Sequence, residues 1–296
     1  MPDSWILWTL LAATMQSVRT AAQKQLADDM SAIAATLVRY LFGVPFVIGY
    51  FAVVSGRAEL LPDLNATFLI CATVAGVLQI VATVLLVQLF TLRNFAVGST
   101  YARTEIMLTA LLGTLFFGEA IELLGWLAIA ICVAGLIAVN IGKSGRFNDI
   151  WNRSAVLGLG SGLAFSLTSL LIRQASLSLG IDDAVLSAAM TLTYMVLIQT
   201  TMVLSYVLIT NRGELRTVAA CWRTGTFVGA TSVAGSAGWF TAFTLERASY
   251  VKTLGQIEFL ITLGIAMSWF GERPGRLELI GMFVILAGVL MLLLAP

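Results

Sequence analysis

Two glutamates, Glu105 and Glu258, lie at the centres of long apolar stretches of this chain. A charge at the centre of a bilayer costs at least about 2.5–3.5 kcal/mol on insertion scales, so a pair of acidic residues there indicates a function. Such a carboxylate can bind an amine or carry a proton. Ion pairing with Arg19, Arg39 or Arg103 is the structural alternative.

Residues at helical spacing from these glutamates extend the candidate site. Tyr101 and Thr109 lie four residues before and after Glu105, and Thr262 lies four residues after Glu258. Side chains four residues apart share one face of a helix. The threonines have a simpler alternative, because a threonine in a membrane helix often donates its hydroxyl to a carbonyl group of its own helix.

Gln16, Gln79 and Trp239 add polar groups from three other apolar stretches. A polar side chain in lipid has to face protein or water, so each of these lines a cavity or forms hydrogen bonds between helices. The ring of Trp239 can also hold an aromatic or cationic solute, although a lone tryptophan often packs or anchors a helix. The predicted solute site comprises Gln16, Gln79, Tyr101, Glu105, Thr109, Trp239, Glu258 and Thr262.

The composition indicates that these residues lie in a membrane. Of 296 residues, 59% are hydrophobic and 11% are charged, and the mean hydropathy is +0.94. Soluble domains carry roughly 25% charged residues, so a soluble enzyme, a nucleic-acid-binding protein and a disordered chain are excluded. The chain has no histidine and three dispersed cysteines. We therefore expect no metal, no cofactor and no catalytic triad.

The fold class that follows is an all-α integral membrane protein. A membrane-spanning helix needs about 20 mainly apolar residues, and charged and turn residues separate ten such stretches. The predicted transmembrane helices cover residues 4–26, 31–54, 67–91, 95–117, 122–142, 154–177, 184–210, 218–244, 249–270 and 276–295.

An internal repeat relates the first five spans to the last five. A shift of 153 residues superposes Glu105 on Glu258, Thr109 on Thr262, and the turn 117–119 (Phe-Gly-Glu) on 270–272. We therefore divide the chain into a first repeat at 1–142, a linker at 143–153 and a second repeat at 154–296.

Five spans are an odd number, so the second repeat is expected to cross the membrane in the opposite sense. The loop charges agree, since the loop after the fourth span carries Glu119 and Glu122, whereas its counterpart carries Arg273 and Arg276. Opposite basic content is what the positive-inside rule requires of an inverted repeat. Inverted repeats are typical of transporters that work by alternating access, with a site near the midplane.

Several acidic residues outside the apolar stretches have structural interpretations. Glu119 and Glu272 are each expected at the start of the following helix, where a carboxylate favours the positive helix end. The pairs 28–29 and 182–183, both Asp-Asp, are predicted to cap the second and seventh spans.

These features resemble the EamA-type members of the drug/metabolite transporter superfamily. The resemblance rests on two five-span halves, each with a Phe-Gly-Glu turn and then a helix with a late Ala-Gly (134–135 and 287–288), and on Arg39 followed by Tyr40. It implies a ten-helix inverted-repeat carrier whose members mostly export amino acids, related metabolites or lipophilic cations. It also implies a substrate cavity lined mainly by spans one, three, four, six, eight and nine.

The sequence therefore predicts a secondary transporter in the plasma membrane, the inner membrane of a bacterium. Its partners would be a small organic solute (an amino acid, a related metabolite or an organic amine), a coupling proton or other ion, and the bilayer, with no nucleic acid. A flippase for a lipid-linked metabolite and a channel are the alternatives. A membrane enzyme is disfavoured, because the chain has no histidine and no acidic cluster to hold a metal.

Overall fold

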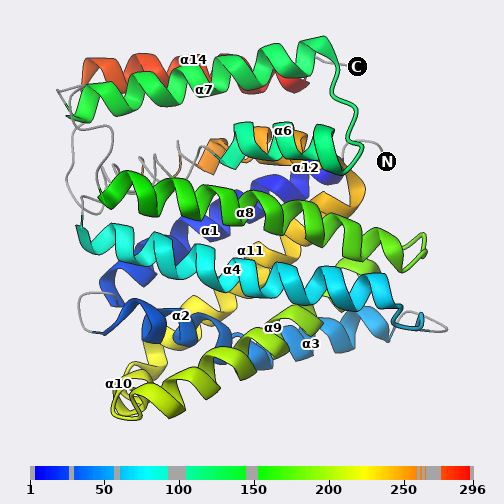
Figure 1. Cartoon of the computed structure of the whole chain (residues 1–296), viewed down its shortest axis with the longest axis vertical. Coiled ribbons are helices and arrows are strands. Elements are labelled where there is room, and N and C mark those ends of the chain that lie inside the picture. Colours follow the sequence, from blue (N-terminus) through cyan, green and yellow to red (C-terminus); the bar gives the residue numbers. More distant parts are fainter. Residues whose placement is uncertain are drawn as a thin grey trace.

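A computed structural model describes residues 4–26, 30–56, 61–92, 105–144, 153–258, 261, 264 and 275–293. The regular secondary structure within these ranges is helical, and Figure 1 shows the helices running largely along one direction. They are α1 (Ser4–Leu26), α2 (Ala32–Leu41), α3 (Val44–Ser55), α4 (Ala66–Leu92), α6 (Glu105–Phe116), α7 (Leu123–Ser144), α8 (Arg153–Ser178), α9 (Ala184–Thr210), α10 (Glu214–Ala220), α11 (Trp222–Leu245), α12 (Ala248–Leu254) and α14 (Arg276–Leu293).

Four stretches are long and apolar enough to cross a membrane by length and composition: Ala32–Ser55, Ala66–Leu89, Val156–Ser178 and Ala184–Thr210. Large apolar side chains such as Phe116, Ile209 and Phe283 are exposed on the outside of the bundle, as a lipid-facing surface requires. The chain is thus a multi-pass helical membrane protein. Every predicted span overlaps a helix in the described ranges, while the number of ten crossings stays a prediction.

The second predicted span is one continuous helix in the prediction and two helices in the structure. α2 ends at Leu41 and α3 begins at Val44. Pro45 lies in the first turn of α3, where its missing N–H leaves no helical hydrogen bond unmade. The helix therefore breaks next to Pro45, which the prediction had included in one continuous span.

The strongest helix pairings are α7 with α14, α4 with α8, and α1 with α11. In Figure 1, α7 and α14 lie side by side at one edge of the bundle, and α3, α9 and α10 lie at the other. α6 packs on α8 and on α12, so it connects the α4–α8 pair to α12.

α7 and α14 approach closely through a reciprocal pair of glycines. A Cβ on Gly135 would lie 2.8 Å from Ile285, and a Cβ on Gly288 would lie 2.7 Å from the sulfur of Cys132. Cys132 and Ile285 are themselves 153 positions apart, and the thiol of Cys132 donates to the carbonyl oxygen of Ile285. Ile285 contacts Gly135, and Gly288 contacts Cys132. The two helices therefore run antiparallel, and their contacts are related by a two-fold axis.

The helix caps confirm one predicted acidic cap and correct another. Asp183 caps α9 as predicted and accepts from the backbone N–H groups of Val185 and Leu186. The N-cap of α2 is Ser31, which accepts from Ala34 N; it takes the position that we predicted for 28–29, a pair outside the described residues.

Glu119 also departs from its prediction. We expected it at the start of the next helix, but its carboxylate accepts from Ala248 N at 2.8 Å and from the hydroxyl of Ser249 at 2.9 Å. These residues begin α12, more than a hundred residues further along the chain. The turn after α6 leaves the carboxylate pointing at α12 rather than α7, so Glu119 links two distant segments.

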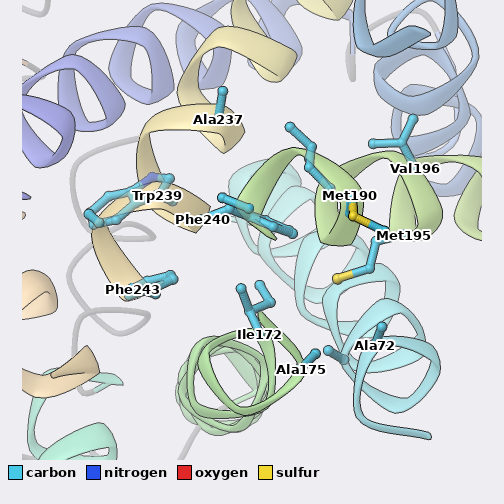
Figure 2. Packing of buried hydrophobic residues seen from close by; sticks show 14 of the residues in the cluster. Ala72, Ile172, Ala175, Met190, Met195, Val196, Ala237, Trp239, Phe240 and Phe243 are labelled. Atoms are coloured by element: carbon cyan, nitrogen blue, oxygen red, sulfur yellow. The ribbon is translucent and has the colours of Figure 1, made fainter. Parts of the chain in front are cut away.

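The largest apolar core lies between α8, α9 and α11. Figure 2 shows Phe240 pointing from α11 toward Met190 and Ile172, while Trp239 and Phe243 lie on another side of the helix. Phe240 is 1% exposed. Trp239 and Phe243 belong to the same core, and together with Phe240 they also line an internal cavity.

Candidate functional site

A cavity of about 70 Å³ lies among α1, α2, α4, α6, α8, α11 and α12, which is room for roughly five water molecules. Its walls contain aromatic rings, hydroxyls and amides together with five charged side chains. The charged ones in the described ranges are Arg19, Arg39 and Lys252 as cations, and Glu105 and Glu258 as anions. The described part of the lining thus has one more positive than negative charge.

Glu105 forms an ion pair across the cavity with Lys252 of α12. The distance from Lys252 Nζ to Glu105 Oε2 is 3.1 Å, and the two side chains are 9% and 15% exposed. Both charges are largely removed from water, which is costly for an ion without a partner. Each is therefore the principal counter-charge that the structure provides for the other.

Aromatic rings enclose the same ammonium group. Nζ of Lys252 lies 5.0 Å from the ring centroid of Trp239, 5.6 Å from that of Phe243 and 5.9 Å from that of Phe165. A cation within about 6 Å of an aromatic face is attracted by the ring quadrupole. Trp239 and Phe243 are also stacked on each other, with centroids 5.6 Å apart. We call Glu105 and these three rings the ammonium cage.

Gln16 connects the cage to Glu258. Its amide nitrogen donates to Glu258 Oε2 at 2.8 Å, and its amide oxygen accepts from the indole N–H of Trp239 at 2.8 Å. Both ends of the amide are used, so the side chain has one orientation. The glutamates of the two predicted repeats thus line one cavity, joined through Lys252, Trp239 and Gln16.

The two arginines of the lining differ in how far they are satisfied. Arg39 is 3% exposed, and it donates from Nε to Ser232 Oγ and from Nη1 to Thr83 Oγ1. Arg19 is 5% exposed, and its Nε has no hydrogen-bond partner in the part of the chain that the structure describes. A buried donor without a partner is costly, which makes Arg19 a group that a bound acceptor would stabilise.

The structure brings together five of the predicted site residues. Gln16, Gln79, Glu105, Trp239 and Glu258 all line the cavity. The amide oxygen of Gln79 also accepts from a neighbouring glutamine side chain on α9 at 2.8 Å.

One predicted residue does not join this group, and two others lie outside the described residues. Thr109 is fully buried, does not line the cavity, and donates its hydroxyl to the carbonyl oxygen of Glu105 in its own helix. Tyr101 and Thr262 lie outside the described residues. Arg103, one of the three arginines named in the structural alternative, also lies outside them; among the described residues, Lys252 pairs with Glu105.

Lys252 is the important residue that the sequence prediction missed. It is one of two charged residues within the predicted span 249–270, and a basic residue costs as much in lipid as an acidic one. That placement was a usable signal. Phe165 and Phe243 gave no comparable signal, because a cavity-lining phenylalanine cannot be told from a lipid-facing one in sequence.

The fold and this cavity define a class, namely helical membrane proteins with a charged, partly aromatic chamber between their helices. Comparison with known proteins gives the family. Residues 3–141 match the model of the EamA-like transporter family. The match agrees with the resemblance predicted from the sequence, and together with the curated relative described next it supports an EamA-type member of the drug/metabolite transporter superfamily.

Two further similarities agree with this assignment. An uncharacterized transporter in the cobO 3' region of a Sinorhizobium species is 22% identical over 141 residues, which are 48% of this chain and 99% of that protein. A crystal structure described simply as that of a protein superposes with a TM-score of 0.72 at 14% identity, covering 99% of this chain and 97% of that one. At that identity the likeness concerns the fold.

Proposed function

We propose that this transporter carries a small amino acid, or a closely related small solute with a carboxylate group, across the plasma membrane by alternating access. The observation that carries the proposal is the charge of the cavity lining, in which three cations face two carboxylates among the described residues. Lys252 already neutralises Glu105. A solute that brings a carboxylate would balance the lining, whereas an organic amine would add to its positive charge.

Arg19 is the group that we assign to the solute carboxylate. Its guanidinium is buried on the cavity wall and has an Nε donor without a partner among the described residues. Guanidinium groups bind carboxylates through paired, charge-assisted hydrogen bonds. Arg39 contributes a second positive charge to the same cavity, and Glu258 supplies a negative charge for the ammonium group of an amino acid.

The helix packing supports two repeats of five spans, at 1–142 and 154–296. Shifting α1 by 153 residues brings it onto α8, and shifting α4 brings it onto α11, so the pairs α1–α11 and α4–α8 exchange with each other. α7 and α14 correspond in the same way and run antiparallel. Opposite directions of corresponding helices support an inverted repeat, in which rocking of one repeat against the other alternates access to the cavity.

The length of the Sinorhizobium relative is consistent with this division, since 141 residues cover 99% of it and thus about one repeat. Export is the direction that the family resemblance implies, and we propose export on that basis. The inner membrane of a bacterium is the proposed location.

A binding experiment with matched ligands tests the substrate class. Thermal unfolding of the purified protein is followed with a small amino acid, with the amine that lacks its carboxylate, and with the acid that lacks its amino group. A ligand that binds the folded state raises the melting temperature by mass action. We expect the amino acid to stabilise the protein most and the amine to have no effect; stabilisation by the amine alone would overturn the proposal.

Uptake into proteoliposomes then tests transport and the role of Arg19. Arg19→Gln should lower uptake of the amino acid at least tenfold, because a charge-assisted pair with the solute is lost. Arg212→Gln, which changes an exposed arginine after the end of α9 that donates to the carbonyl oxygen of Leu208, is the matched control and should behave like wild type. Equal uptake by both variants would refute the assignment of Arg19, and an ohmic ion conductance without saturation would favour a channel.

A further inference from the structure

The ammonium cage has the chemistry of a binding site for organic cations, and the protein fills it with its own lysine. A carboxylate oxygen at 3.1 Å and three aromatic rings within 6 Å surround Nζ of Lys252. Carboxylates and aromatic faces are the groups that recognise ammonium ligands in general. We propose that Lys252 acts as a tethered cation, a specificity-determining residue that excludes organic amines from a latent cation site.

The surroundings of Nζ argue against a purely structural salt bridge. Among the described residues, Glu105 is the hydrogen-bond acceptor that the structure gives this group. The other directions are taken by aromatic faces rather than by carbonyl or hydroxyl oxygens. An ammonium group held in this way resembles a bound ligand more closely than a cation that neutralises a cluster of acids.

Two walls of the cage, Trp239 and Phe243, are held in place independently of Lys252. The indole of Trp239 is fixed by its hydrogen bond to Gln16 and by its stacking on Phe243. Gly255 lets the indole ring approach the turn after α12, because a Cβ there would overlap the ring. Removing the lysine side chain should therefore leave a preformed site that has lost its occupant.

The occupied cage also explains how the transporter would discriminate between solutes. A free amine entering the cavity would meet the ammonium group of Lys252 at the groups best suited to bind it, and two like charges in a dry site repel each other. An amino acid can place its carboxylate near Arg19 and avoid the cage. This part of the inference rests on the proposed function in taking the cavity as the solute site.

Chemical replacement of the lysine side chain tests the inference. Lys252→Ala empties the cage, and n-propylammonium chloride supplies an ammonium group on an alkyl chain of suitable length. We expect n-propylammonium to raise the melting temperature of Lys252→Ala in a saturable manner, with an affinity at least tenfold higher than for wild type. The neutral isostere n-propanol should have no such effect, because it fills the space without the charge.

Two variants serve as matched controls for the cage. Lys252→Met fills the cage with an uncharged chain, and Lys252→Ala combined with Glu105→Gln keeps the space but removes the carboxylate. Neither should bind n-propylammonium more tightly than wild type does. Equal affinity in wild type and Lys252→Ala, or in the Lys252→Ala variants with and without Glu105, would overturn the inference.

Folding of the variant does not limit the test. Lys252→Ala leaves Glu105 without its partner and is purified both with and without n-propylammonium. A yield of folded protein that rises with n-propylammonium, but not with n-propanol, would also demonstrate the expected binding. Lys252→Ser repeats the measurement in a second emptied variant, and failure of n-propylammonium to stabilise both variants would overturn the inference.

The same assay separates this inference from the proposed function. If the wild type binds an amino acid but Lys252→Ala does not bind n-propylammonium, the proposed function is supported and the tethered cation is refuted. The opposite pattern would refute the amino acid as substrate and sustain the tethered cation.

Discussion

Replacing Glu119 by glutamine perturbs a link between distant segments of the chain. The carboxylate accepts from Ala248 N at 2.8 Å, from Ser249 Oγ at 2.9 Å and from Ser249 N at 3.4 Å. It also lies 3.7 Å from Arg173 Nε on α8. Arg173 in turn donates to the carbonyl oxygens of Phe243 and Glu246 at the end of α11. Glu119 thereby ties the loop after α6 to α8, α11 and α12.

The expected cost of Glu119→Gln is about 3 kcal/mol of stability. Hydrogen bonds to a charged group contribute about 1.5–3 kcal/mol each, and breaking a buried ion pair costs about 3–5 kcal/mol. The glutamine oxygen can still accept from Ala248 N, so part of the interaction survives. The side chain of Arg173 is 22% exposed, whereas that of Glu119 is 5% exposed, so water can solvate the arginine left behind and lower the cost further.

Thermal unfolding in detergent, followed by intrinsic fluorescence, measures this effect. Glu122→Gln is the matched control, because Glu122 is exposed in the same loop and should change the melting temperature little. A double variant with Arg173→Gln should be less destabilised than the sum of the two single changes, since the two residues share one network. A Glu119→Gln protein as stable as Glu122→Gln would refute the link between the segments.

Three further predictions concern the cavity. Glu105→Gln and Glu258→Gln should both lower uptake and flatten its pH dependence. Glu105→Gln should also lower the melting temperature more than Glu258→Gln does, because it leaves the buried ammonium group of Lys252 unpaired. Unchanged uptake and pH profiles in both variants would show that these glutamates have a structural role. Gly255→Ala should shift tryptophan emission and weaken solute binding at least fivefold, since its Cβ would displace the indole ring, whereas Gly49→Ala, which faces open space, should do neither. Thr109→Val should leave uptake within twofold of wild type, because the hydroxyl of Thr109 donates to a carbonyl oxygen of its own helix. A larger loss of uptake would indicate that Thr109 belongs to the solute site.

The amino-acid sequence by itself determined the class of the protein and most of its helices. An apolar run of about 20 residues has few alternatives to a helix in lipid, because each backbone polar group must be satisfied within the segment. The predicted spans 4–26 and 184–210 coincide with α1 and α9. Polar residues within such runs, among them Gln16, Glu105 and Glu258, had to face the interior for the same reason, and they line the cavity.

The tertiary structure alone decided which polar groups meet. Glu105 pairs with a lysine 147 positions away, Gln16 with a glutamate 242 positions away, and Glu119 with residues 129 and 130 positions away. Membrane helices are apolar toward both lipid and protein, so hydropathy does not reveal how each helix is rotated in the bundle. That rotation brings three cations and two carboxylates of the described residues into one cavity, whereas the predicted site residues had included the two carboxylates and no cation.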